Sequence, residues 1–302
     1  MERYARKGRR SAFSGEDLKD LKLDYVDTYF LHWPFPNYHA PGCDGDARNP
    51  DSRPFSVEEF MATWRQLERI QKMGLARNIG MSNMTVAKLE AVLPLCEIKP
   101  VLIEMELHPC FQQQELFDYC VGQSIQPIGF CPIGSPTRPE RDKTAEDVAD
   151  IQVPEVVEIA KAHNVHPAVI CLKWAVQRGQ IPIPFSIYEN EYVSNLRCTV
   201  EDPLTEKEME VMKTVDRNCR LVKGQVFLWE GAKAGKTSGI WTARLQSEGI
   251  FSSVIDCNRA LFAVSLWGPL GKPIIMRRKK IGAGTDDPVL QVISIFVLSA
   301  GA

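Results

Sequence analysis

Short apolar runs alternate with segments of helical periodicity along most of the chain. The run Val26–Leu31 is rich in β-branched and aromatic residues, which predicts a strand that ends at His32. Four further strands are expected on the same grounds, at Arg77–Met81, Val101–Glu106, Ile125–Phe130 and Ile181–Pro184. The helices expected around them lie at Ser56–Lys72, Thr85–Leu93, Gln112–Val121, Pro154–His163, His166–Arg178, Glu189–Cys198 and Thr205–Val215. Strands separated by helices at this spacing predict parallel βα units, because a parallel crossover needs about a dozen residues.

Such an alternation fits either a doubly wound sheet or a barrel. Two observations favour the barrel: the chain has no GxGxxG turn, and polar residues recur directly after the strands, where barrel enzymes build their sites. Only five strands can be counted, whereas a closed barrel of this type has about eight. We therefore expect an α/β fold, a (β/α)8 TIM-type barrel that is incomplete because its first βα units, about three, are missing.

Composition narrows the class of protein. The 302 residues are 44% hydrophobic and 25% charged, as in soluble globular proteins, and no run of 18 apolar residues predicts a membrane span. The formal net charge of -2 gives no reason to expect nucleic acid or an anionic membrane as partner. Nine cysteines are scattered without a CxxC pair, so we expect reduced thiols in a cytoplasmic chain and no metal site.

Candidate chemistry begins at the first strand end, where His32 is followed by Trp33 and Pro34. A neutral histidine at a barrel mouth can donate a hydrogen bond to a substrate carbonyl and stabilise the developing alkoxide. For an isolated histidine, a buried residue that merely caps a strand is the alternative. Ser82 and Asn83 end the next strand with two short polar side chains that suit a carboxamide.

The ordered series of strand ends resembles the aldo-keto reductase superfamily. Asp20–Pro34, Gly80–Asn83, Lys99–Pro109 and Phe130–Pro136 match the motifs of that family in order and approximate spacing. The resemblance covers about Asp17 to Trp229 and implies an NAD(P)H-dependent oxidoreductase that reduces an aldehyde, ketone or sugar carbonyl to the alcohol.

The resemblance also implies roles for individual residues. His32 becomes the catalytic, substrate-orienting histidine, and Trp33 part of the substrate pocket wall. Glu104 stands where the family usually has glutamine, and Phe130 matches the aromatic residue that stacks on the nicotinamide. The cofactor-binding residues implied in this way are Ser82, Asn83, Glu104, Phe130, Cys131, Pro132, Ser135, Phe185, Ser186 and Asn195.

Two departures from the family bear on the cofactor. Phe185 replaces a common lysine, and Glu191 lies near a common arginine, although both cations help to hold a 2'-phosphate. The cofactor is therefore expected to be NADP or NAD, with dual or NADH-leaning use as the hypothesis.

A further departure concerns the proton donor. The resemblance places the general-acid tyrosine, its lysine partner and an aspartate upstream of the stretch that starts at Asp17. Tyr4 and Lys7 lie in a basic arm and are not assigned to those roles. Two alternatives stay open: a non-catalytic nicotinamide-binding module or inactive fragment, and a chain whose unpaired strand edges prevent stable folding.

Three segments are expected. Residues 1–13 form a basic arm expected to be disordered, 14–232 a partial barrel domain, and 233–302 an atypical tail of low order. The tail is interpreted as the product of a fragmentary or imperfect gene model, with a genuine extension as the alternative. The expected partner is a small-molecule carbonyl substrate, with neither nucleic acid nor membrane, and nothing in the sequence specifies an oligomeric state.

Overall fold

The computed structural model describes residues 18–19, 21–34, 54–136, 143–198 and 200–222, together with the backbone of 274–276 and 298–300. The predicted arm at 1–13 and most of the predicted tail at 233–302 lie outside these ranges. The three domain boundaries therefore stay predictions.

Five parallel strands form one sheet whose spatial order follows the chain. They are β1 (Val26–Leu31), β2 (Ala76–Ser82), β3 (Leu102–Glu106), β4 (Gln126–Phe130) and β5 (Ile181–Pro182). A doubly wound sheet would reverse its order at a switch point, whereas this sheet continues in one direction as a barrel wall does. The predicted incomplete (β/α)8 barrel is confirmed. Only β5 is markedly shorter than predicted: it ends at Pro182, after which the Ile183 N–H still donates to the Gly129 carbonyl of β4.

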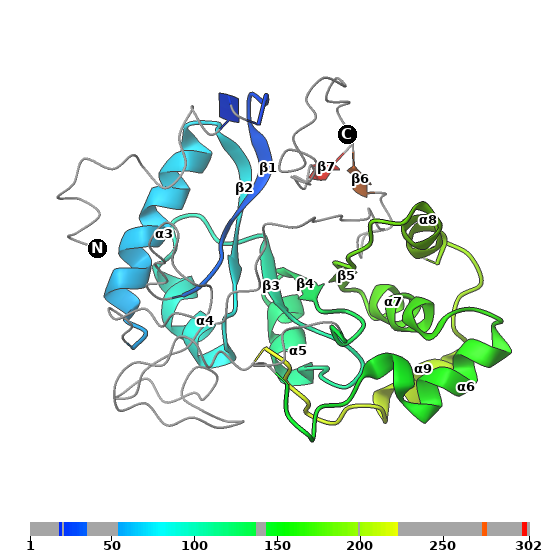
Figure 1. Ribbon diagram of the computed structural model, residues 1–302. Coiled ribbons are helices and arrows are strands. Elements are labelled where there is room, and N and C mark those ends of the chain that lie inside the picture. Colours follow the sequence, from blue (N-terminus) through cyan, green and yellow to red (C-terminus); the bar gives the residue numbers. More distant parts are fainter. Residues whose placement is uncertain are drawn as a thin grey trace.

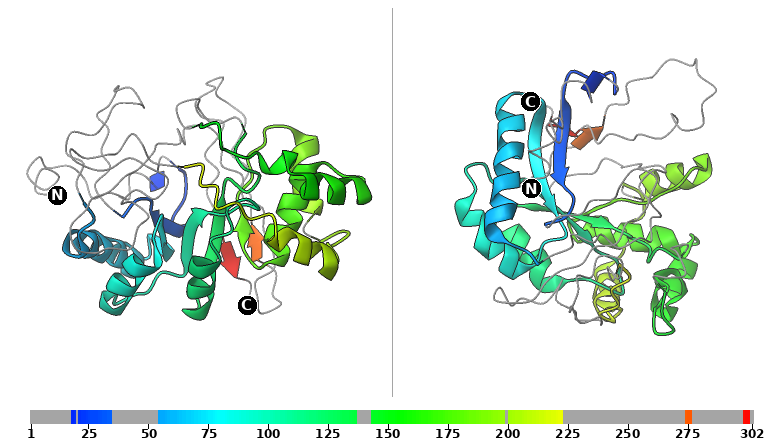
Figure 2. Two further views of the ribbon diagram at one scale, coloured as in Figure 1. Left: turned by 90° about the horizontal axis from the view of Figure 1, so that it is seen from below. Right: turned by 60° about the vertical axis from the view of Figure 1, so that its left-hand side comes forward.

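The described helices flank the sheet in two groups (Figures 1 and 2). Helices α3, α4 and α5 cover the outer side of β1–β4, and helices α6, α7 and α9 pack together beside β5. Their bounds are α3 (Val57–Lys72), α4 (Val86–Val92), α5 (Gln114–Gly122), α6 (Pro154–Ala162), α7 (Pro167–Gln177), α8 (Glu189–Arg197) and α9 (Glu206–Lys213). Short 3-10 turns occur at Leu93–Leu95 and Asp150–Gln152, and β6 (Ile274–Met276) pairs antiparallel with β7 (Leu298–Ala300).

Side-chain caps begin α3, α4, α7 and α9. The Ser56 hydroxyl accepts a hydrogen bond from the backbone N–H of Glu59 at the start of α3. At α9 the Thr205 hydroxyl and the Glu208 carboxylate form a reciprocal capping box. Both of these caps satisfy backbone N–H groups that the first turn of the helix leaves without an internal partner.

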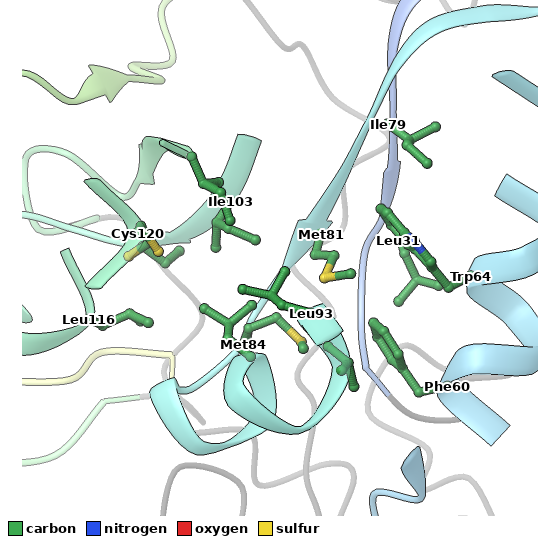
Figure 3. Close-up of a cluster of buried hydrophobic side chains, with 14 of the residues drawn as sticks. Leu31, Phe60, Trp64, Ile79, Met81, Met84, Leu93, Ile103, Leu116 and Cys120 are labelled. Atoms are coloured by element: carbon green, nitrogen blue, oxygen red, sulfur yellow. The ribbon is translucent and has the colours of Figure 1, made fainter. Parts of the chain in front are cut away.

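The two faces of the sheet have different surroundings. Outward-facing side chains such as Ile79, Met81 and Ile103 pack against the helices around the fully buried Trp64 (Figure 3). Each large apolar side chain buried there contributes roughly 1.5–3 kcal/mol through removal of its surface from water. The Trp64 indole N–H donates to the carbonyl of Ile98 at 3.1 Å, so its polar edge is also satisfied.

The inner face carries its own apolar layer of Leu102, Ile128 and Ile181, against which Phe30 packs. Gly80 lies within this layer, and a Cβ at that position would lie 2.4 Å from the Phe30 ring. The absence of a side chain at Gly80 therefore leaves room for the Phe30 ring to lie over β2. The inner face leads directly to the carboxyl ends of the strands.

Candidate active site at the strand ends

The sheet register brings several predicted site residues onto the inner face. Ser82 pairs with Glu104, and Glu104 pairs with Ile128, a member of the inner layer. Cross-strand partners in a parallel sheet point to the same face, and side chains two residues apart along a strand do so as well. Phe130 follows Ile128 by two positions, and His32 continues β1 beside Ser82. All four polar or aromatic side chains therefore gather at one edge of the sheet.

Hydrogen bonds connect the polar members of this group. The Ser82 hydroxyl donates to Oε2 of Glu104 at 3.3 Å, and Ser82 is fully buried. The Asn83 backbone N–H donates to the Glu104 carbonyl, and its side-chain Nδ2 donates to the His32 carbonyl at 2.9 Å. The buried Oδ1 of Asn83 accepts no hydrogen bond from the described residues. An oriented and unsatisfied acceptor of this kind suits a ligand donor.

The carboxyl group of Glu104 departs from ordinary behaviour. Its side chain keeps partial solvent access, yet the surrounding protein is dense enough that burial raises the pKa of Glu104 to about 7. The hydrogen bond from Ser82 favours the ionised form and offsets this only in part. Near neutral pH the carboxyl is therefore divided between its acid and its carboxylate forms.

His32 lies at the open side of the group. Its side chain is exposed to solvent, and desolvation by the protein around it lowers the pKa of the imidazole. The exposure limits the size of this effect but not its direction. At neutral pH the ring is uncharged and carries one N–H donor.

Two aromatic side chains form a wall next to the histidine. The Trp33 ring lies 5.4 Å from the His32 ring between centroids, tilted by 37°. Trp33 clusters with Cys131 and Val222, and Phe130 packs against this cluster. The sheet therefore brings together the predicted pocket residue and the predicted stacking residue.

The turn after β4 holds three predicted cofactor contacts, Cys131, Pro132 and Ser135. Cys131 and Ser135 adopt positive φ angles of 53° and 38°, and the Gly134 N–H closes the turn on the Cys131 carbonyl at 2.9 Å. A thiol is a weak donor, so Cys131 offers a phosphate less than a serine hydroxyl would.

The remaining predicted cofactor residues form a second group after β5. The Phe185 ring is 57% exposed and is not part of the cluster of Trp33 and Phe130. Ser186 is buried, and its hydroxyl donates to the Glu191 carboxylate at 2.5 Å. Asn195 lies further along α8 with intermediate exposure. This group offers an aromatic face and a carboxylate, with no cation among these four side chains.

A buried ionic cluster lies next to the strand ends, and its residues were not predicted from the sequence to have a role. It consists of Glu106, His108, Asp150 and Arg220, and we call it the carboxylate clamp. Nε2 of His108 lies 3.1 Å from Oε1 of Glu106, and its Nδ1 lies 3.0 Å from Oδ1 of Asp150. Burial disfavours a charged imidazole, but Asp150 and Glu106 together raise the pKa of His108 to about 9. The ring is therefore an imidazolium that donates to both carboxylates at neutral pH.

The clamp also holds a distant part of the chain against β3. The two oxygens of Glu106 accept from the backbone N–H groups of Leu221 at 2.6 Å and Val222 at 3.0 Å. Because Val222 packs against Trp33, the clamp supports the aromatic wall. The sequence held one signal for this cluster: polar residues alternate at Glu104, Glu106 and His108 on an otherwise apolar strand.

The described residues contain neither a membrane-spanning helix nor a cluster of metal ligands. Among the helices that the structure describes, none combines the length and apolar character needed to cross a membrane. Within the same ranges, no three His, Cys, Asp or Glu side chains are arranged to hold a metal ion. The expectation of a site without metal stays a prediction.

Known proteins with similar sequences are aldo-keto reductases. The family model described as aldo/keto reductase family matches residues 2–217. Aldo-keto reductase family 1 member A1 of Xenopus tropicalis is 32% identical over 206 residues, which are 68% of this chain and 62% of that protein. An aldo/keto reductase of Synechocystis is 34% identical over 218 residues, covering 71% of this chain and 65% of the relative. The chain thus spans less than two thirds of the length of these relatives.

Solved structures agree with this assignment. An aldo-keto reductase of Bombyx mori, determined in complex with NADP, is 25% identical with a TM-score of 0.57 and covers 68% of this chain and 62% of its own. An aldo-keto reductase from a deep-sea metagenome library is 25% identical with a TM-score of 0.55, over 68% and 65% of the two chains. The chain therefore belongs to the aldo/keto reductase family, and its five-stranded sheet is part of a (β/α)8 barrel wall.

Proposed function

We propose that this chain provides the nicotinamide-binding side of a carbonyl-reducing site, in which an aldehyde, ketone or sugar carbonyl becomes an alcohol. The observation that carries the proposal is the convergence of His32, Ser82, Asn83, Glu104 and Phe130 at one edge of the sheet. The buried and unsatisfied Oδ1 of Asn83 in particular suits the amide of a nicotinamide. The Bombyx mori relative, solved with NADP, supports the same cofactor class.

Each residue has a distinct part in this proposal. Ser82, Asn83 and Glu104 hold the carboxamide through hydrogen bonds, and the exposed face of Phe130 stacks on the nicotinamide ring. The reduced nicotinamide supplies the hydride when bound. His32 is neutral, so its N–H orients the substrate carbonyl and stabilises the negative charge that develops on the oxygen.

The proposed cofactor preference is dual or NADH-leaning. The Ser186 hydroxyl is already engaged by the Glu191 carboxylate, and that negative charge opposes a 2'-phosphate. Exposed Phe185 adds no compensating positive charge. Titrating the purified chain with both cofactors tests the preference: Glu191→Gln is expected to improve NADPH binding and to leave NADH binding unchanged. An NADPH affinity more than tenfold above that for NADH in the wild type contradicts the proposal.

A second candidate, cofactor binding without turnover, is favoured by where the described tyrosines lie. Tyr25 lies under the Arg77 guanidinium at 3.9 Å, and Tyr29 and Tyr119 pack into the outer core. Tyr188 caps the start of α8 with 60% of its surface exposed, and Tyr192 lies within that helix. No described tyrosine belongs to the cluster of Trp33 and Phe130, so in this candidate a tyrosine acid would have to come from residues outside the described ranges.

One experiment separates the two candidates. NADH fluorescence measures binding by the purified chain, and NADH oxidation in the presence of aldehydes and sugars measures turnover. Turnover that is lost in His32→Ala, with binding retained, supports reduction. His166→Asn is the matched control, because His166 caps the exposed start of α7 and asparagine can cap it as well. Binding without turnover supports the second candidate, and the absence of binding contradicts both.

A further inference from the structure

Building on the proposed cofactor site, we propose that binding of the nicotinamide cofactor takes up one proton at Glu104. Cofactor affinity then falls as the pH rises above neutrality. Glu104 is thereby a positioning residue whose protonation state decides whether the carboxamide can be held.

The proposal rests on the number of hydrogen-bond donors and acceptors around Glu104, at the edge of the sheet where the strands end. A primary carboxamide presents N–H donors and a carbonyl acceptor, so its site needs both acceptors and donors. The buried Oδ1 of Asn83 is an acceptor, while the Nδ2 of the same residue is engaged at the His32 carbonyl. The Ser82 hydroxyl donates to Glu104. With Glu104 ionised, the cluster has an excess of acceptors, and its hydroxyl donor is held by the carboxylate.

Protonation of Glu104 corrects this imbalance. The carboxylic acid offers one O–H donor to the ligand carbonyl, and its remaining oxygen still accepts from the ligand N–H. It also releases the Ser82 hydroxyl for the ligand. A neutral carboxyl group thus presents one donor and one acceptor side by side, as a carboxamide requires.

Among the residues that the structure describes, no cation lies against Glu104 to hold it ionised. On β1 the nearby His32 is neutral, and β4 carries no charged residue. On the same strand, Glu106 lies two positions from Glu104 and is bound within the carboxylate clamp. Arg220 belongs to the clamp as well, with its Nη1 atom 3.8 Å from Oε2 of Glu106. Burial accordingly raises the pKa of Glu104 to about 7, so its protonation changes within the working range of an enzyme.

Helices packed outside the sheet carry two buried titratable groups of note: Glu68 of α3, which pairs with Arg65, and Lys88 of α4. Lys88 of α4 is buried, lies 5.7 Å from the centre of the Phe55 ring, and has its pKa lowered to about 7 by burial. The acids Glu115 and Asp118 of α5 are exposed on the opposite side. Lys88 titrates in the same range as Glu104, so the experiment must separate the two.

The dissociation constant for NADH, measured from pH 6 to pH 9, tests the proposal. NADH is chosen because it lacks a 2'-phosphate, a group that titrates near pH 6. If only the protonated site binds, the dissociation constant rises about tenfold per pH unit above the transition, roughly a hundredfold by pH 9. Calorimetry at pH 8 in two buffers of different ionisation enthalpy is expected to show uptake of nearly one proton per cofactor.

Variants assign the proton. Glu104→Gln keeps both a donor and an acceptor, so it is expected to bind NADH with a pH-independent affinity and without proton uptake. Lys88→Gln and the exposed Glu90→Gln are expected to retain the pH dependence of the wild type. Circular dichroism at each pH checks that every variant remains folded.

The outcomes distinguish this inference from the function on which it rests. A wild-type affinity that is measurable but unchanged from pH 6 to pH 9 overturns proton uptake and leaves the cofactor site standing. Unaltered pH dependence in Glu104→Gln also overturns it, because another group is then responsible. Failure of both the wild type and Glu104→Gln to bind NADH at pH 6 overturns the cofactor site and the inference together.

Discussion

Two glutamates on β3 occupy neighbouring positions on one face and behave in opposite ways. Burial alone would raise the pKa of Glu106, but its hydrogen bond from His108, the charge of Arg220 and the Leu221 N–H hold it below the usual range. Glu104 receives one hydrogen bond, from Ser82, and its pKa rises to about 7. Desolvation by the surrounding protein raises the pKa of both carboxyl groups, so their partners make the difference.

The contrast separates a structural polar cluster from a candidate binding cluster. In the clamp the buried charges find their partners within the fold, which ties distant segments together. At the edge of the sheet beside Glu104, some buried polar groups, such as Oδ1 of Asn83, have no hydrogen-bond partner among the described residues. Buried polar groups without partners in a barrel opening suit the binding of a ligand. Mutations and pH changes can test whether this division holds.

The largest expected effect is that of Glu106→Gln. The amide would present a donor to the Leu221 and Val222 N–H groups and would leave the His108 imidazolium short of one carboxylate. Loss of one partner from a buried ionic cluster costs about 3–5 kcal/mol. We expect the free energy of unfolding, measured with urea at pH 7, to fall by that amount. Glu90→Gln on the exposed side of α4 is the control, and equal effects of the two substitutions would refute a stabilising clamp.

A somewhat smaller effect is expected from pH acting on His108. Its pKa in the folded chain, about 9, lies above the ordinary value of 6.5. The charged ring therefore stabilises the fold fully below pH 6.5, and this contribution is lost as the pH rises toward 9. The loss is on the order of 3 kcal/mol. Urea unfolding at several pH values should show the decline in the wild type and a flatter curve in His108→Gln.

The substitution Glu104→Gln is expected to act in the opposite direction to Glu106→Gln. The folded-state pKa of Glu104 lies above its ordinary value, so burial of this carboxyl costs stability increasingly from about pH 4.5 to pH 7, and fully above that. Removing the charge should raise the free energy of unfolding at pH 8 by on the order of 2 kcal/mol, discounted for partial solvent access. Near pH 4 the same substitution should have little effect. A lower free energy of unfolding for Glu104→Gln at pH 8 would contradict this, because it would mean that the Glu104 carboxylate makes a stabilising interaction in the folded chain.

The smallest effect is expected where an ion pair is exposed. Lys161 and Glu158 approach to 2.6 Å on α6, closer than the ions of the clamp, but both side chains are about two thirds exposed. Water screens such a pair, so Lys161→Gln should leave the urea midpoint within measurement error. A clear loss of stability would mean that the distance between two ions, rather than their burial, determines how much an ion pair stabilises this fold.

Much of the fold was predictable because its signals are local. The apolar run Val26–Leu31 forms β1 with the predicted bounds, and the helix predicted from Thr205 begins at a capping box of Thr205 and Glu208. The predicted end of β5 at Pro184 was wrong, since the strand pairs with β4 only through Ile181 and Pro182. Residues placed directly after strands could be expected to meet, since parallel strands end at one edge of the sheet.

The sequence by itself determined the alternation of strands and helices, and hence the edge at which His32, Ser82 and Phe130 gather. Periodicity and turn chemistry act over a few residues, and both can be read along the chain. Only the tertiary structure decided which of two neighbouring glutamates is charged. Glu106 accepts from the N–H of Val222, 116 positions away, whereas Glu104 accepts from Ser82 and meets no cation within the described part of the chain. Burial and ionic partnership depend on distant segments folding together, so the chemistry of the mouth is a property of the assembled sheet.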